Sequence, residues 1–144
     1  ATPMIARWPA VVPAGAINYQ VTHVIDFMAT LLDTAGAEYP EAYNGRSIQP
    51  LEGESFLPAL RGEHGQRERP LFWEHEGNRA VRDGRWKLVS RYPGPWELYD
   101  MVADRTELND LAQRDKPRVE EMAAAYERWA ERCGVLPWER VSGA

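Results

Sequence analysis

Hydrophobic and polar positions alternate in short runs between Leu71 and Asp100, and this pattern predicts an antiparallel meander. An Asp-Gly pair, Asp83-Gly84, separates two of the runs and favours a type I′ hairpin, in which both central residues have positive φ. The predicted strands are Leu71–His75, Arg79–Arg82, Arg85–Ser90 and Trp96–Tyr99. The stretch is therefore expected to form a four-stranded antiparallel sheet.

The alternation also predicts the two faces of this sheet. Ala80, Trp86 and Leu88 are expected on an apolar face, whereas Arg85 and Lys87 point to the opposite, solvated face. An apolar sheet face must be covered by another element, because burying each large side chain contributes roughly 1.5–3 kcal/mol. The sheet therefore requires a partner from elsewhere in the chain.

The longest predicted helix supplies this cover. It begins after Asp115, an N-cap residue, tolerates Pro117 in its first turn, and ends at Gly134. Its apolar stripe recurs at helical spacing and consists of Val119, Met122, Ala123, Tyr126, Trp129, Ala130 and Cys133. We expect the stripe to pack on the Trp86/Leu88 face and to bury Cys133 as an inert thiol.

The first third of the chain has a different character. Met4–Trp8 reads as a strand buried on both faces, and Thr22 as the N-cap of a helix that ends at Gly36. The apolar face of that helix comprises Ile25, Met28, Leu31, Leu32 and Ala35. A single strand cannot satisfy its own backbone groups, so we expect the rest of its sheet to belong to a longer protein from which this chain is cut.

Three shorter segments complete the pattern. Residues 37–48 are polar and predict a connecting loop, and Ser55 caps a short helix through Leu60. Asp104 and Glu107 form a capping-box pattern for a short helix carrying Leu108 and Leu111. The predicted fold class is α+β, with an incomplete α/β domain over residues 1–60 and a sheet-plus-helix subdomain over residues 61–144.

Composition narrows the classes of partner. The chain has 144 residues and a formal net charge of −5, with Arg and Glu interspersed, which argues against a nucleic-acid partner. No apolar run approaches the roughly 20 residues that a membrane span needs. The single cysteine excludes an internal disulfide framework and a cysteine metal cluster.

Candidate chemistry is sparse. His75 is the most informative histidine, because it stands at a strand end that leads into a tight turn, where a side chain can meet a ligand. The alternative is a turn residue bonded locally by Glu76 or Asn78. No second histidine lies at metal-ligand spacing, no two carboxylates are paired by spacing, and no Gly-rich phosphate loop is present. The residues alone predict no complete active site and no metal site in this chain.

Several segments in order resemble the C-terminal part of the sulfatases, the arylsulfatase family of the alkaline-phosphatase-like superfamily. The segments span residues 3–138. They are Pro3–Pro9 with Gly15, His23–Asp26 through Thr30–Leu32 to Ala35-Gly36, Gly53–Ser55 with Pro58, Leu60 and Gly62, Asn78–Arg82 with Gly84, Trp86, Lys87 and Leu88, and Trp96–Asp100 leading to Asp104, Glu107, Asn109, Leu111 and Ala112. The chain departs from the family at Ala29 and Arg105, where proline is frequent, and it lacks the C/S-x-P-x-R signature.

The resemblance implies a parent enzyme that hydrolyses sulfate esters with a formylglycine nucleophile and Ca²⁺, and that is periplasmic or secreted. The catalytic groups and the metal ligands would lie in a missing N-terminal catalytic half, so this chain alone is predicted to bind no cofactor and to be inactive. Its expected role is scaffold and part of the substrate cleft. The resemblance places substrate contacts at Glu74, His75, Asn78 and Arg91.

Two other readings stay open. One is a standalone binding module that uses the aromatic-rich meander as its recognition face. The other is a fragment of a related phosphatase or phosphonate hydrolase. Met4–Trp8 discriminates the first, because a module would pair this strand, whereas a fragment leaves an orphan edge open to homodimerisation.

Overall fold

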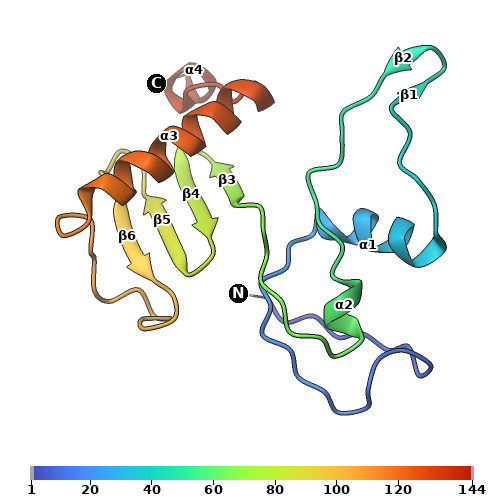
Figure 1. Cartoon of the computed structure of the whole chain (residues 1–144). Helices are drawn as coiled ribbons and strands as arrows, with labels where there is room; N and C mark the ends of the chain where they lie inside the picture. The colour runs from blue at the N-terminus through green and yellow to red at the C-terminus, as the bar shows by residue number, and fades with distance from the viewer. Residues whose placement is uncertain (1, 144) are drawn as a thin grey trace. The chain divides into compact units, whose positions relative to one another are not determined.

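The computed structural model describes residues 2–143 and divides into two compact units, Ala1–Glu68 and Arg69–Ala144 (Figure 1). The elements are mixed α and β, which confirms the expected α+β class. Among the described residues, no helix combines the length and the apolar character that crossing a membrane requires.

The predicted meander is confirmed in the second unit. Its four strands are β3 (Leu71–His75), β4 (Asn78–Asp83), β5 (Trp86–Ser90) and β6 (Glu97–Asp100), and they pair antiparallel in the order β3-β4-β5-β6. The turn between β3 and β4 is Glu76-Gly77, with positive φ at both residues (52° and 79°), as a type I′ turn requires.

The turn between β4 and β5 differs from the expected type I′ hairpin centred on Asp83-Gly84. Asp83 pairs with Trp86, so the central residues are Gly84 and Arg85. Gly84 has φ of 50°, and Arg85 is not among the described residues with positive φ. This pattern is that of a type II′ turn, in which glycine occupies the first central position. The Asp-Gly pair located the hairpin but not its register.

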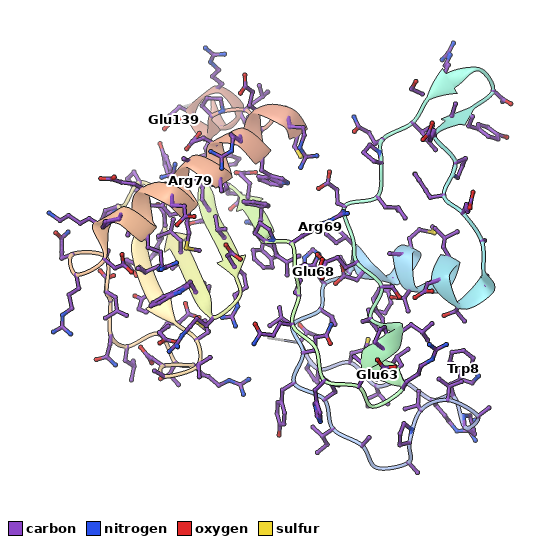
Figure 2. The ribbon with its side chains drawn as sticks, in the orientation of Figure 1. Trp8, Glu63, Glu68, Arg69, Arg79 and Glu139 are labelled. Carbon is purple, nitrogen blue, oxygen red and sulfur yellow. The ribbon has the colours of Figure 1, made fainter. Side chains whose placement is uncertain are left out.

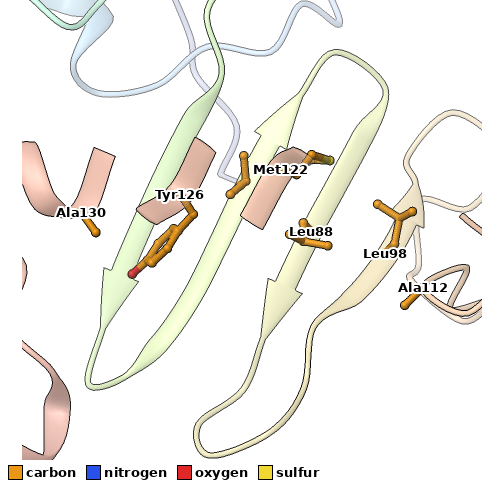
Figure 3. Close-up of a cluster of buried hydrophobic side chains, with 7 residues drawn as sticks. Leu88, Leu98, Ala112, Met122, Tyr126 and Ala130 are labelled. Carbon is orange, nitrogen blue, oxygen red and sulfur yellow. The ribbon is translucent and has the colours of Figure 1, made fainter. Parts of the chain in front are cut away.

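The core of this unit lies between the sheet and one long helix, α3 (Lys116–Cys133). Val81, Leu88 and Leu98 occupy facing positions on β4, β5 and β6, and each is at most 1% exposed. Met122 and Tyr126 of α3 pack onto them, as Figure 3 shows. The expected cover of the Leu88 face is confirmed.

One member of the predicted apolar face is wrong. Ala80 pairs with Val89, one position away from the Val81–Leu88 pair, and therefore lies on the opposite side of the sheet from Leu88. Both Ala80 and Val81 are apolar, so alternation in this short strand could not decide between them. Val81 fills the core because it is the larger side chain in register with Leu88.

The ends of α3 follow the predicted signals. Asp115 accepts a hydrogen bond from the Arg118 N–H at 3.2 Å, and Gly134 closes the helix with φ of 69°. Cys133, however, is exposed rather than buried. Ala130, one turn earlier, is the last residue of the stripe that is buried in the core. A five-residue helix, α4 (Trp138–Ser142), follows without a clear periodic signal in the sequence.

The short helix expected after Asp104 is absent from residues 101–114, which form turns. The Asp104 carboxylate instead accepts the N–H groups of Leu108 and Asn109 at 2.8 and 2.7 Å. Glu107 has φ of 59°, which a helix excludes, and its carboxylate binds Lys87 of β5 at 2.6 Å. This long-range ion pair replaces the local capping box.

The first unit is mostly irregular. Residues 2–7 lie outside any strand and Ile5 is 96% exposed, so the expected strand at Met4–Trp8 does not form in this structure. No neighbouring strand among the described residues pairs with it. The homodimer expectation depended on that strand and stays untested. The two-stranded hairpin of β1 (Ala42–Tyr43) and β2 (Arg46–Ser47) lies within the predicted loop, with Asn44-Gly45 as its turn.

Two helices complete this unit, α1 (Asp26–Ala35) and α2 (Leu57–Leu60). α1 starts later than the expected cap at Thr22, because the Asp26 carboxylate accepts the His23 N–H at 2.7 Å and holds residues 23–26 in a turn. Its predicted C-terminal Gly36 is confirmed, with φ of 63°. Ser55 lies one residue before Phe56, which is the N-cap of α2, and its Oγ accepts the N–H of Leu57, the first residue of the helix, at 3.2 Å.

The buried face of α1 is polar rather than apolar. Asp26 is 1% exposed and accepts the Glu54 N–H at 2.9 Å and Arg67 Nη1 at 2.6 Å. One turn later, Thr30 Oγ1 accepts the Phe56 N–H at 3.0 Å. These bonds attach the segments around residues 54 and 67 to one helix. The predicted apolar face, by contrast, is largely exposed, with Met28 at 51% and Leu31 at 64%.

Candidate functional site

A cavity of about 370 Å³ lies within the second unit, at one end of the sheet. Four parts of this unit line it: the β3–β4 hairpin, the segment between β5 and β6, the C-terminal half of α3 and the segment that follows α3. The lining residues are Glu74, Gly77, Arg79, Ser90, Tyr92, Pro93, Gly94, Tyr126, Glu127, Ala130 and Val135 to Glu139. The volume is in the range of about 300–1,000 Å³ that is typical of small-ligand sites.

Tyr126 forms part of the cavity wall while belonging to the core. Its ring packs edge-on to Trp96 at 5.5 Å between centroids, and the residue is 2% exposed. Burial first, and then the nearby Glu74 carboxylate, raises the pKa of its hydroxyl to about 12. No other described residue forms a hydrogen bond with this hydroxyl. Tyr126 therefore offers a neutral donor held by a rigid ring.

Arg79 is the one cation among the described lining residues. Its guanidinium lies 4.3 Å from the centroid of the Trp96 ring, and Nη2 donates to Ser90 Oγ at 3.3 Å. A looser ion pair of 3.6 Å joins Nη1 to Glu127 Oε1. The aromatic ring, the serine and the carboxylate together hold the Arg79 side chain. Figure 2 labels Arg79 and, on the far side of the cavity, Glu139.

The outer wall is fastened by one side-chain hydrogen bond. The Tyr92 hydroxyl donates to Glu139 Oε1 at 2.9 Å, which joins the segment after β5 to the start of α4. This bond raises the pKa of Tyr92. The pKa of Glu139 is lowered by its own backbone N–H and then by the Tyr92 hydroxyl. The hydrogen bond between the Tyr92 hydroxyl and the ionised Glu139 carboxylate therefore holds this wall together.

Gly77 lets this wall approach the hairpin. A Cβ at this position would lie 2.8 Å from the Tyr92 ring and 3.0 Å from the Trp138 Cβ, and the residue has φ of 79°. Both the backbone conformation and the close approach therefore require glycine. The Gly77 N–H donates to Glu74 Oε1 at 2.9 Å, so the hairpin turn also orients a cavity carboxylate.

The balance of charge in the cavity is negative. Three glutamates, Glu74, Glu127 and Glu139, lie opposite the single guanidinium of Arg79. Two aromatic side chains, Tyr92 and Trp138, add apolar ring surface. The glutamates of this lining can accept hydrogen bonds from the hydroxyl or ammonium groups of a ligand, and Tyr126 can donate one. The excess negative charge repels an anionic ligand.

Only one of the four predicted substrate contacts lines this cavity. Glu74 lines the cavity, but His75, Asn78 and Arg91 do not. The His75 side chain is 82% exposed, with Nδ1 4.0 Å from Glu76 Oε2. Asn78 supports the turn, because its Nδ2 donates to the His75 carbonyl and its Oδ1 accepts the Tyr92 N–H. Arg91 is exposed, and its carbonyl accepts the Gly94 N–H.

Sequence reasoning missed most of the cavity. The sequence analysis places Tyr126 only in the apolar stripe of the helix, and Arg79 only at the start of a predicted strand. Val135–Glu139 carried no signal beyond Pro137, which marks a turn. A signal that could have found Tyr126 was its hydroxyl, because a buried tyrosine needs a partner for its polar end.

The structure provides no metal centre in the part of the chain it describes. No group of three or more His, Cys, Asp or Glu side chains could hold an ion within residues 2–143.

Comparison with known proteins places the chain in a family. Residues 1–131 match the family described as N-sulphoglucosamine sulphohydrolase, C-terminal. An N-acetylglucosamine-6-O-sulfatase of Bacteroides thetaiotaomicron is 33% identical over 115 residues, which cover 76% of this chain and 21% of that protein. An N-acetylgalactosamine-6-sulfatase of Sus scrofa is 39% identical over 106 residues, covering 71% of this chain and 19% of that protein.

Solved structures agree with these relatives. The crystal structure of Ps i-CgsB superimposes with a TM-score of 0.70 at 26% identity, covering 85% of this chain and 27% of that one. The chain spans about a fifth of the length of the curated relatives it matches. Because the family match covers most of the sequence, the chain belongs to the family described as N-sulphoglucosamine sulphohydrolase, C-terminal, and it corresponds to the C-terminal part of the sulfatases it matches.

Proposed function

We propose that this chain is the C-terminal region of an enzyme that hydrolyses sulfate esters of saccharides, and that the chain supplies scaffold and part of the substrate cleft without catalysing the reaction itself. The observation that carries the proposal is the family match over residues 1–131. The curated relatives are about five times longer than the region they share with this chain, which leaves room for a catalytic part outside it.

The reactive groups are assigned to that other part. The C/S-x-P-x-R signature that would supply a formylglycine is absent from this sequence, and residues 2–143 hold no group of metal ligands. Ca²⁺ and formylglycine therefore enter the proposal as components of the remaining protein, where the metal would polarise the sulfate and the formylglycine would serve as nucleophile. No step of the reaction is assigned to a residue of this chain.

The names of the relatives indicate the substrate class. One relative is an N-acetylglucosamine-6-O-sulfatase and another is an ulvan-active sulfatase from Formosa agariphila, 30% identical over 100 residues. Ps i-CgsB has also been solved in complex with k-i-k-neocarrahexaose. All three names refer to sulfated or saccharide substrates. A sulfated saccharide is therefore the preferred substrate class.

Exposed apolar residues on and just before α1 indicate that another part of the protein covers this side of the first unit. Val24, Phe27, Met28 and Leu31 follow one another at helical spacing and are 44–68% exposed. A contiguous apolar stripe of this kind marks a surface that another element covers. We assign that role to the N-terminal part of the same protein.

The test is to express the full-length protein that carries this region and to measure sulfate release from 4-nitrophenyl sulfate and from sulfated saccharides, with and without a calcium chelator. We expect calcium-dependent release by the full-length protein and none by the 144-residue chain. Turnover by the chain alone would contradict the proposal. Faster hydrolysis of phosphate or phosphonate esters than of sulfate esters would favour the phosphatase reading instead.

The standalone binding module is not favoured. The family match and the relatives all place this region inside larger sulfatases. The same expression experiment distinguishes the two readings, because an independent module would retain its stability and its ligand when separated from the rest of the protein.

A further inference from the structure

We propose that the cavity beside Tyr126 is a subsite for an uncharged or amino-bearing sugar ring of the saccharide substrate, separate from the group that carries the sulfate ester. The assignment rests on the proposed sulfatase function for its biological setting. Its physical basis is a cavity of about 370 Å³ that offers a tyrosine hydroxyl with no protein partner, several carboxylate acceptors and exposed aromatic surface. That combination suits a polyhydroxylated ring.

The polar groups match the hydroxyls of a sugar. Tyr126 is 2% exposed, and its hydroxyl makes no hydrogen bond to another described residue, so it is available to a ring oxygen or hydroxyl in the cavity. Glu74 and Glu127 supply carboxylate acceptors from two different elements, β3 and α3. Donor and acceptors therefore converge from fixed positions of the fold.

The aromatic groups match the apolar edges of a sugar ring. Tyr92 is 38% exposed, and Trp138 also faces the cavity. The hydrogen bond from Tyr92 to Glu139 and the close approach of Gly77 to both aromatic side chains hold this surface in place. Rigid aromatic surface costs little conformational entropy when a ligand binds.

The charges argue against a sulfate group at this position. Three carboxylates oppose one guanidinium, and Arg79 is already engaged by Glu127, Ser90 and the Trp96 ring. Like charges within about 4–6 Å disfavour one another strongly in a partly buried site. The ring bound here is consequently neutral or carries an amino group.

The wall of the cavity lies outside the shared part of the family. The family match ends at residue 131, whereas Val135–Glu139 form one side of the cavity. The subsite is therefore built by combining the shared sheet and helix with a following segment that the family match does not include. This arrangement would let saccharide preference vary without changing the shared scaffold.

The decisive variants are Tyr126→Phe and Trp138→Ala in the full-length protein. Tyr126→Phe keeps the ring in the core and removes only the unpaired hydroxyl, so the fold is retained. Tyr43→Phe is the matched control, because Tyr43 is 70% exposed and lies in β1 of the first unit. Circular dichroism establishes that all three variants fold as the parent does.

Two readouts separate this inference from the proposed function. The first is equilibrium binding of unsulfated probes measured by calorimetry: an N-acetylglucosamine trisaccharide, a desulfated carrageenan hexasaccharide and a desulfated ulvan oligosaccharide. We expect at least one probe to bind, with affinity reduced about two- to tenfold by Tyr126→Phe, about threefold to tenfold by Trp138→Ala, and unchanged by Tyr43→Phe. Binding is measured whether or not the protein is an active sulfatase.

The second readout is kcat/KM on a sulfated monosaccharide and on a sulfated oligosaccharide. We expect Tyr126→Phe to lower the value for the oligosaccharide by a larger factor than the value for the monosaccharide, and Tyr43→Phe to change neither. Absence of sulfatase activity in the parent would refute the proposed function while the calorimetry still decides the subsite. If no probe binds, or if Tyr126→Phe and Trp138→Ala bind every probe as the parent does, the subsite assignment is overturned.

Discussion

Replacing Asp26 by asparagine is expected to loosen the first unit of the protein. Asp26 is 1% exposed, and its carboxylate accepts three hydrogen bonds: from the His23 N–H, the Glu54 N–H and Arg67 Nη1. The Arg67 side chain is itself only 6% exposed. Asparagine has the same shape, but its amide must place an NH₂ group against one of these donors and removes the negative charge beside a buried guanidinium.

The structure sets the scale of the effect. Removing one partner of a buried ion pair costs about 3–5 kcal/mol. Asp33→Asn, on the same helix, is the matched control. Asp33 is exposed and its carboxylate accepts a single hydrogen bond, from Ser55 Oγ, so its replacement should cost less than about 1 kcal/mol.

Hydrogen exchange measured by mass spectrometry on the full-length protein is the suitable assay, since it reports the opening of one region rather than of the whole molecule. Peptides covering residues 23–33 and 54–60 should exchange about a hundredfold faster or more in Asp26→Asn, since about 1.4 kcal/mol corresponds to a factor of ten. The peptides of β4 and β5 should be unaffected. Equal protection in Asp26→Asn and Asp33→Asn would refute the argument, because it would mean that water reaches the Asp26 carboxylate in the native protein.

Three further outcomes follow from the second unit. Leu88→Ala should lower the free energy of unfolding by about 2–5 kcal/mol in urea denaturation, whereas Val102→Ala, at an exposed turn position, should change it by less than about 0.5 kcal/mol. Gly77→Ala should destabilise more than Gly84→Ala does, because both have positive φ but only Gly77 has a side chain within 3 Å of the added Cβ; thermal melts of the two variants compare them directly. The pKa of Asp104 is held below its ordinary value, chiefly by the Asn109 N–H, so the loop it closes should be stable above the ordinary aspartate pKa and loosen as pH falls through the lowered one; an NMR titration that gives an ordinary or raised pKa for Asp104 would contradict this.

Local signals sufficed for the second unit wherever a few neighbouring residues determine the conformation. Asp115 and Gly134 cap α3, and the apolar stripe between them has one plausible partner, the meander. The signals failed where a distant residue decides. Glu107 leaves the helical region of φ and ψ and pairs with Lys87, 20 positions earlier, and no capping rule includes that interaction.

The first unit shows the opposite limit. The apolar face predicted for α1 exists, but its members Met28 and Leu31 remain exposed, while Asp26 and Thr30 are buried. A periodicity argument assumes that apolar residues find a cover within the same chain. It cannot anticipate that the helix is attached to the unit by a polar network on its other side. Met4–Trp8 fails for a related reason, since strand formation depends on hydrogen bonds from a neighbour.

The candidate site was harder to predict than the fold because its central residue serves two environments. The ring of Tyr126 packs with Trp96 and Trp129 in the core, while its hydroxyl contributes to the cavity. Hydrophobic periodicity identifies the ring and gives no information on the hydroxyl. This double role has a physical consequence: a donor that is held by core packing is as rigid as the helix and sheet around it.

Leu88→Ala should therefore weaken binding of an unsulfated saccharide and also lower stability, although Leu88 does not line the cavity. Relaxation of the core around residue 88 would release the Tyr126 ring from its position. A loss of stability with unchanged saccharide affinity would show that the ring is positioned by its aromatic neighbours alone.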